Sequence, residues 1–132
     1  MKREAHIVFL TREFTFDSAH NLVRYHGKCE KLHGHTYRMA VTLSGHPDDE
    51  GMLMDFVELK RIVHERIIAK FDHAYLNDIV AQPTAENIAR YVFEALDPLL
   101  RGPNFALHEV CVWETARSFV AFRREDLPEG GR

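Results

Sequence analysis

Two long runs of alternating side chains dominate the sequence, and they predict two β-strands that each bury one face. The first run ends in a histidine: Phe14, Phe16, Ser18, His20. The second begins with two histidines: His33, His35, Tyr37, Met39, Val41, Leu43. Side chains two residues apart in a strand point to the same face. The three histidines therefore close the ends of two buried strand faces, where their imidazoles can converge.

Three converging imidazoles are typical of a catalytic zinc site, in which the protein supplies three ligands and a fourth position stays open. Cys29 lies four residues before the histidine pair, a spacing that can hold its sulfur beside the ion rather than on it. The alternative is chance, because nine of the 132 residues are histidines. The coincidence of His20 at a strand end with Cys29 in the connecting segment favours a zinc site made by His20, His33 and His35.

Beyond these strands, the pattern predicts two helices and two further strands. The first helix starts after Asp55 as its N-cap and ends near Lys70. The second starts after Thr84 and ends before Pro98. Strands are expected over about 5–20, 35–45, 106–115 and 118–123.

This order of elements predicts an α+β domain, with an antiparallel four-stranded sheet carrying two helices on one face. The domain should span residues 1–124, followed by a frayed tail over residues 125–132. Exposed sheet edges in such a domain are satisfied by neighbouring subunits, so we expect a closed homo-oligomer.

Composition excludes several functional classes. The net charge of −3 argues against a nucleic-acid partner. No apolar run approaches bilayer-spanning length, and the N-terminus lacks the apolar segment of a secretory signal. We therefore expect a cytoplasmic protein without a membrane partner. The two cysteines suggest no disulfide framework, and Cys111, in an apolar strand, is expected to be a buried, inert thiol.

Asp72 and His73 form a candidate proton-transfer pair, since a nearby carboxylate fixes the tautomer of an imidazole and raises its basicity. Adjacent residues rarely pair well, so the dipeptide alone is weak support. Cys29 could take part in the chemistry only as a thiolate. A nearby metal ion and the positive charges of Lys28 and Lys31 would favour that ionised form. Zinc can stabilise an enediolate-like intermediate. Together these groups could move protons at carbons next to oxygen.

Glu114 shares a strand face with Val110 and Val112. A carboxylate on a buried face needs a partner, and the amino-pyrimidine edge of a pterin or guanine would pair with it through two hydrogen bonds. Alternatively, Glu114 lies in water at the strand end and pairs with Arg117. The residues alone leave both interpretations open.

In order along the chain, these motifs closely resemble the 6-pyruvoyl-tetrahydropterin synthase family. Within it, the sequence is most similar to the bacterial branch that makes 6-carboxytetrahydropterin for queuosine biosynthesis. The similarity runs from about residue 6 to residue 123. It rests on Phe16–His20, Cys29–His35, Met54-Asp55-Phe56, Asp72–Asn77, Pro83–Asn87 and Glu114-Thr115.

The resemblance implies the tunnelling fold, in which subunits join their sheets into a barrel, with a tetramer or hexamer and sites at subunit interfaces. It implies 7,8-dihydroneopterin triphosphate as substrate and release of acetaldehyde and triphosphate. By the same analogy, the zinc ligands are His20, His33 and His35. The thiolate of Cys29 would abstract the proton, and Asp72 and His73 would relay it. Glu114 would anchor the pterin, and Thr84 and Glu86 would contact it at a subunit interface.

Other outcomes remain open within the resemblance. Lys28, with Arg24, His26 and Lys31, either receives the triphosphate or belongs to a solvated basic loop. Glu30 resembles the base of a folate-pathway branch that releases 6-hydroxymethyl-dihydropterin, so it is an alternative base if it does not point to solvent. A 6-pyruvoyl product is a further alternative, and a non-catalytic pterin or purine binder with structural zinc is an alternative of a different class.

Overall fold

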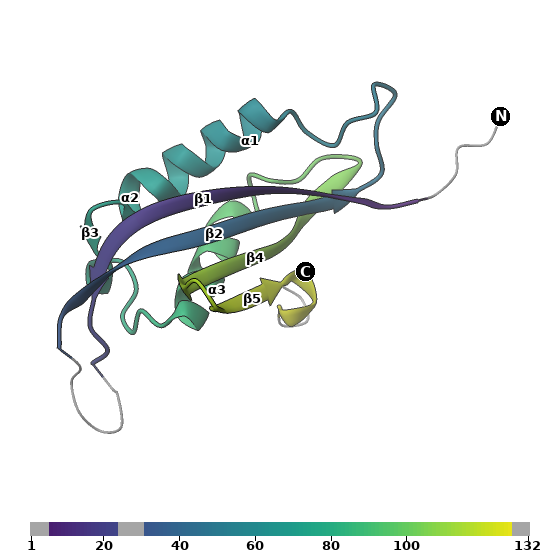
Figure 1. Cartoon of the computed structure of the whole chain (residues 1–132). Coiled ribbons are helices and arrows are strands. Elements are labelled where there is room, and N and C mark those ends of the chain that lie inside the picture. The colour runs from purple at the N-terminus through teal and green to yellow at the C-terminus, as the bar shows by residue number, and fades with distance from the viewer. Residues whose placement is uncertain (1–5, 24–30, 128–132) are drawn as a thin grey trace.

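The computed structural model describes residues 6–23 and 31–127 (Figure 1). Five strands form one sheet in the order β3-β1-β2-β4-β5. The strands are β1 (Val8–His20), β2 (His33–Gly45), β3 (Ala74–Tyr75), β4 (Phe105–Thr115) and β5 (Ser118–Arg123).

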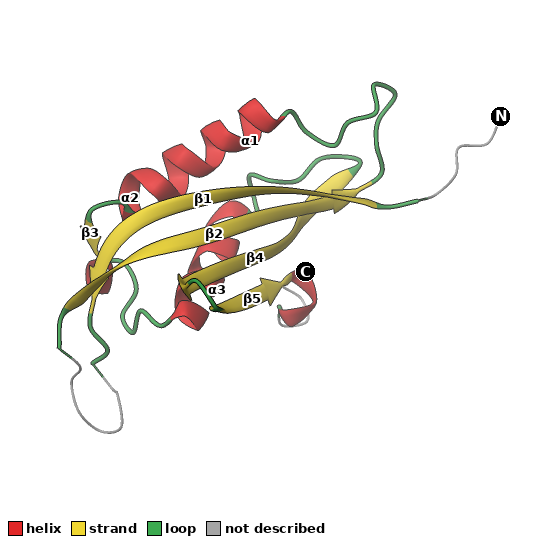
Figure 2. Cartoon of the chain, in the orientation of Figure 1, coloured by secondary structure: helices red, strands yellow, loops and turns green. Residues whose placement is uncertain are grey.

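Two helices lie on the same face of this sheet (Figure 2). The first is continuous through α1 (Phe56–Val63), a π-helical turn η1 (His64–Ile68) and α2 (Ala69–Phe71). The second is α3 (Ala85–Leu96). Short 3₁₀ turns complete the described elements: η2 (Leu76–Asp78) and η3 (Arg124–Asp126).

Both helices begin where the sequence predicts. The Asp55 carboxylate accepts a hydrogen bond from the Val57 N–H, and the Thr84 hydroxyl accepts one from the Asn87 N–H. Such caps satisfy backbone donors that the first helical turn leaves without intrahelical partners. Thr84 thereby fixes the start of α3 beside the sheet end that carries the histidines.

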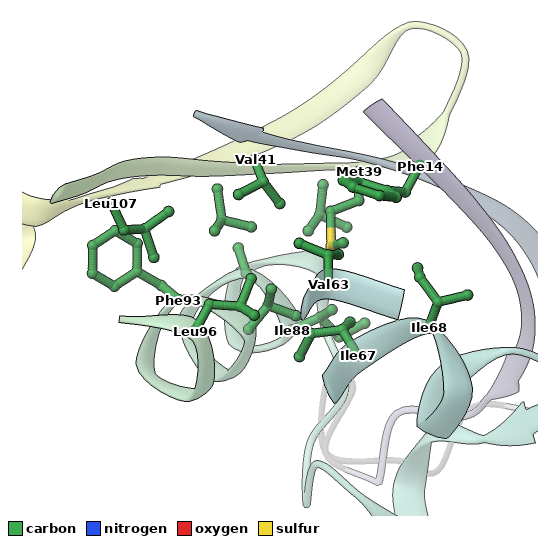
Figure 3. Packing of buried hydrophobic residues seen from close by; sticks show 14 of the residues in the cluster. Phe14, Met39, Val41, Val63, Ile67, Ile68, Ile88, Phe93, Leu96 and Leu107 are labelled. Carbon is green, nitrogen blue, oxygen red and sulfur yellow. The ribbon is translucent and has the colours of Figure 1, made fainter. Parts of the chain in front are cut away.

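The hydrophobic core lies between the sheet and the two helices (Figure 3). Val41 and Leu107 face it from the sheet, and Ile67, Ile88 and Phe93 face it from the helices. Each is fully buried, which contributes about 1.5–3 kcal/mol per large apolar side chain. This burial determines which face of each strand points inwards, and hence which face carries the histidines.

The antiparallel pairing of β1 with β2 confirms the predicted alternation. Phe16 lies opposite Tyr37, and His20 lies opposite His33. Along β1, the side chains of the predicted inward set are buried while Thr15 and Asp17 between them are exposed. The two strands therefore carry their histidines to the same end of the same face.

The predicted α+β class is confirmed, but the sheet has a fifth strand and is mixed rather than purely antiparallel. β3 pairs in parallel with the end of β1, although the sequence pattern predicted no strand between the two helices. Two hydrogen bonds hold the link in place: the Asp17 N–H donates to Asp72 Oδ1 (2.9 Å), and the His73 N–H donates to the Asp17 carbonyl (2.6 Å). A two-residue strand is too short to produce a periodic pattern.

Within residues 6–23 and 31–127, no helix is long and apolar enough to cross a membrane. The sheet of the single chain is open. One edge is β5, and the other is β1, except where the end of β1 pairs with the short strand β3.

Candidate metal centre and adjoining pockets

His20, His33 and His35 converge at one end of the sheet. One ligand nitrogen from each residue lies within 4.8 Å of those of the other two. The His20 side chain is almost fully buried, and the other two are half-buried. The prediction that the imidazoles meet is thus confirmed.

Backbone carbonyls determine which nitrogens of two of these rings can bind a metal. His20 Nδ1 lies 2.8 Å from the Pro83 carbonyl oxygen, and His33 Nδ1 lies 2.8 Å from the Lys31 carbonyl oxygen. A carbonyl only accepts hydrogen bonds, so each Nδ1 carries the proton, and in the neutral rings each Nε2 carries a lone pair. This arrangement is typical of metal-binding histidines, whose second nitrogen is held by an outer partner.

The two Nε2 atoms lie 3.0 Å apart. Two lone pairs facing each other at this distance repel unless a cation lies between them. Tetrahedral zinc with Zn–N bonds of about 2.0–2.1 Å places its ligand nitrogens about 3.3 Å apart. The donors and spacing of the cluster therefore fit a zinc ion, with imidazole chemistry that zinc favours.

Glu114 lies next to this cluster. Its Oε1 atom is 3.6 Å from His35 Nε2, and the side chain is half-buried. The residues before it on the same face, Val110 and Val112, are fully buried. Glu114 therefore lies beside the histidine cluster, and its role in binding stays a prediction.

A cavity of about 380 Å³ opens beside Glu114. Its walls include Thr84 and Glu86 from the start of α3, together with Leu22 and Phe119. The volume lies within the range of about 300–1,000 Å³ found for small-molecule sites. The structure thus brings together the three described residues that the sequence predicted to contact substrate.

Asp72 and His73 lie directly before β3, which pairs with the end of β1. A second cavity, of about 640 Å³, has His35 and His73 among its lining residues. His73 Nε2 is 3.6 Å from Asp72 Oδ2, and the backbone of His73 is left-handed, with φ at 58°. Adjacent residues reach this distance here because the left-handed turn changes the direction of the chain between them. The Asp72 carboxylate is held in turn by the Asp17 N–H.

Cys29, Lys28 and Glu30 lie outside the described residues, as do Arg24 and His26. Their predicted roles as base, phosphate contacts and alternative base remain predictions. The described chain reaches Val23 on one side and resumes at Lys31 on the other.

Several groups that support the site were not predicted from the sequence. The Asn77 side-chain amide makes two hydrogen bonds to the backbone of Asn21, the residue after His20: its Oδ1 accepts from the N–H (3.0 Å) and its Nδ2 donates to the carbonyl (2.8 Å). Gln82 Oε1 accepts from the Val23 N–H (2.9 Å). Backbone partners such as the Pro83 carbonyl have no sequence pattern, whereas Asn77 ends the recognisable motif Asp72–Asn77.

Cys111 is a buried thiol, as predicted. Burial raises its pKa to about 12, and its hydrogen bond to the Glu109 carboxylate acts in the same direction. The thiol is therefore protonated and unreactive at neutral pH.

Comparisons with known proteins find relatives in sequence and in fold. Residues 9–125 match the family model described as 6-pyruvoyl tetrahydropterin synthase. The chain is 32% identical to 6-carboxy-5,6,7,8-tetrahydropterin synthase of Haemophilus influenzae, covering 86% of this chain and 97% of the relative. It is 34% identical to 6-pyruvoyl tetrahydrobiopterin synthase of Dictyostelium discoideum, covering 89% and 97%. The structure of Caenorhabditis elegans 6-pyruvoyl tetrahydropterin synthase matches with a TM-score of 0.79 at 28% identity, covering 92% of this chain and 99% of the other.

Proposed function

The chain belongs to the 6-pyruvoyl tetrahydropterin synthase family, and from this premise we propose that it is a zinc-dependent lyase acting on 7,8-dihydroneopterin triphosphate. The proposed product is 6-carboxy-5,6,7,8-tetrahydropterin, formed with release of acetaldehyde and triphosphate as a step of queuosine biosynthesis. The observation that carries the proposal is the convergence of His20, His33 and His35 beside the Glu114 cavity.

His20, His33 and His35 would hold the zinc ion through three imidazole nitrogens. When bound, zinc would supply Lewis-acid polarisation of hydroxyl or carbonyl oxygens on the substrate side chain. The protein contributes fixed ring orientations, because backbone carbonyls hold His20 and His33 from behind. The chemistry of this donor set leaves room for a substrate oxygen as the remaining ligand.

Glu114 would bind the pterin ring. An ionised carboxylate accepts two parallel N–H donors, which the amino-pyrimidine edge of a pterin presents. Thr84 and Glu86 form the wall of the same cavity.

Proton transfer is assigned to Cys29, Asp72 and His73. Cys29 as thiolate would remove a proton next to an oxygen-bearing carbon, and His73, oriented by Asp72, would pass protons on from the cavity that it shares with His35. Lys28 would contact the triphosphate. The two residues from the 24–30 segment enter this assignment through family resemblance alone.

We further propose a cytoplasmic homo-oligomer, a tetramer or hexamer, in which subunits join sheets into a barrel and the sites lie at subunit interfaces. The open edges at β1 and β5 support this, because backbone groups along such edges are available to another strand.

The test is incubation of zinc-loaded protein with 7,8-dihydroneopterin triphosphate, followed by identification of the products. Acetaldehyde with a carboxypterin supports the proposal. Hydroxymethylpterin with a two-carbon aldehyde would indicate the folate-type reaction with Glu30 as base, and a pyruvoyl product would match the name of the Dictyostelium relative. Absence of any turnover would reject the enzymatic function and leave a pterin binder with structural zinc.

Two cysteine variants test whether Cys29 is the catalytic base. Cys29→Ala should lose nearly all turnover, whereas Cys111→Ala, which changes a buried thiol that donates to Glu109, should keep it. Full activity in Cys29→Ala would move the base role to Glu30.

A further inference from the structure

Tyr37 is a fully buried residue in direct contact with the histidine cluster. It follows His35 by two positions on β2, so it points to the same face of the sheet. We infer that Tyr37 is a positioning residue for the metal centre, acting through His20 and His35 rather than on substrate. This inference rests on the proposed zinc site.

The hydroxyl of Tyr37 lies 3.2 Å from His20 Nδ1, the nitrogen that also faces the Pro83 carbonyl at 2.8 Å. The single N–H of that nitrogen therefore has two oxygen acceptors beside it. Rotating the ring by 180° about its Cβ–Cγ bond would replace Nδ1 with a carbon and lose both contacts. The pair of oxygens thus favours the one orientation that presents Nε2 towards His33.

The ring of Tyr37 contacts a second member of the cluster. Its centroid lies 5.5 Å from that of His35 and 6.0 Å from that of His20, both in edge-on arrangements. On its other side, Tyr37 stacks on Phe16, with centroids 5.1 Å apart and ring planes 13° apart. One rigid aromatic side chain therefore supports two of the three imidazoles.

Core packing alone does not account for the hydroxyl. A phenylalanine would fill the same ring volume and stack on Phe16 equally well. Placing a polar oxygen in a fully buried position is unfavourable unless it has a hydrogen-bonding partner. Here the hydroxyl lies against the outer nitrogen of a proposed metal ligand, the position from which outer residues tune metal affinity.

The test compares zinc affinity by chelator competition in wild type and Tyr37→Phe, which removes only the hydroxyl. We expect zinc affinity to fall by about tenfold, the lower end of outer-residue effects. The visible absorption bands of the cobalt(II)-substituted protein should also shift, because they report ligand geometry and not overall stability. Tyr91→Phe is the matched control: that tyrosine packs against Phe71 on α2, and its variant should bind zinc and cobalt as wild type does.

The outcomes distinguish this inference from the proposed function. If wild type binds no zinc, the metal centre itself is wrong. If wild type binds zinc and Tyr37→Phe matches it in affinity and cobalt spectrum, the positioning role of Tyr37 is wrong while the proposed function stands.

A second variant covers the case in which Tyr37→Phe loses stability. Phe16→Leu loosens the stacked pair but keeps the hydroxyl. Measured in their folded temperature range, Phe16→Leu should retain higher zinc affinity than Tyr37→Phe. The reverse order would mean that packing, and not the hydroxyl, controls the site, and would overturn the inference.

Discussion

His20 Nε2 faces His33 Nε2 at 3.0 Å, and the opposite nitrogen of each ring is hydrogen-bonded to a backbone carbonyl. The two rings therefore arrive at the site with their tautomers already selected. The two Nε2 lone pairs are therefore already oriented for a metal ion before it binds. This lowers the free-energy cost of organising the ligands on binding.

Removing one of these rings should remove the metal. His20→Ala is expected to lower zinc affinity by more than about 100-fold, beyond the range of outer-residue changes. His46→Ala is the control, because that exposed histidine lies in the turn after β2 and contacts the carbonyl of His6 instead. Zinc content after dialysis measures both, and equal zinc in the two variants would contradict the assignment.

Chelation should leave the fold intact. The core packs between sheet and helices, with large contributors such as Ile67 and Phe93 outside the histidine cluster (Figure 3). We expect a chelator to shift the thermal transition downwards through loss of ligand linkage, with the transition still cooperative. Circular dichroism during heating measures this. A metal-free protein without any transition would favour a structural zinc site.

Glu114→Gln should weaken pterin binding while zinc affinity stays near wild type. The neutral amide cannot accept two N–H donors as the carboxylate does, and hydrogen bonds to charged groups are worth about 1.5–3 kcal/mol, so kcat/KM should fall roughly 10- to 100-fold. Glu109→Gln, on the same strand but paired with Arg123, serves as control. Similar losses in both variants would point to strand destabilisation instead of ligand binding.

His73 offers a prediction about stability and activity together. Its left-handed backbone, with φ at 58°, disfavours side chains with a Cβ by about 1–2 kcal/mol. His73→Gly should therefore be at least as stable as wild type in urea, although the ring that would relay protons is gone and turnover should fall. His73→Val should lose both stability and turnover. A strongly destabilised glycine variant would mean that the His73 ring supports the fold.

The two cysteines should differ in reactivity. Because burial and Glu109 raise the pKa of Cys111 to about 12, its thiolate is scarce at pH 8. Iodoacetamide at that pH should leave Cys111 unmodified in the native protein, and mass spectrometry of digested protein would locate any label. In Cys29→Ser, no label should appear until the protein is unfolded. Rapid native labelling of Cys111 would contradict its burial.

Much of the site could be predicted from the sequence because its key residues belong to regular patterns. His20, His33 and His35 continue the alternation of buried strands, so their common face follows from strand geometry. The helix caps at Asp55 and Thr84 were likewise recognisable from residue type and position.

The missing parts depend on contacts between segments far apart in the chain. The link that forms β3 is held by Asp17, which lies 55 residues before Asp72. The position of Glu114 depends on how β4 ends beside His35. The carbonyl that fixes His20 belongs to Pro83, and a carbonyl is common to every residue, so no residue type could reveal it.

The segment 82–84 has a consequence for engineering. Gln82 holds the backbone after His20, Pro83 holds the imidazole itself, and Thr84 caps the helix whose first turn lines the Glu114 cavity. Lengthening this tripeptide by a single residue would misalign the metal ligand and the pocket wall at once. Attempts to widen the pocket for larger rings should therefore redesign the β5 side at Phe119 and leave these three positions unaltered.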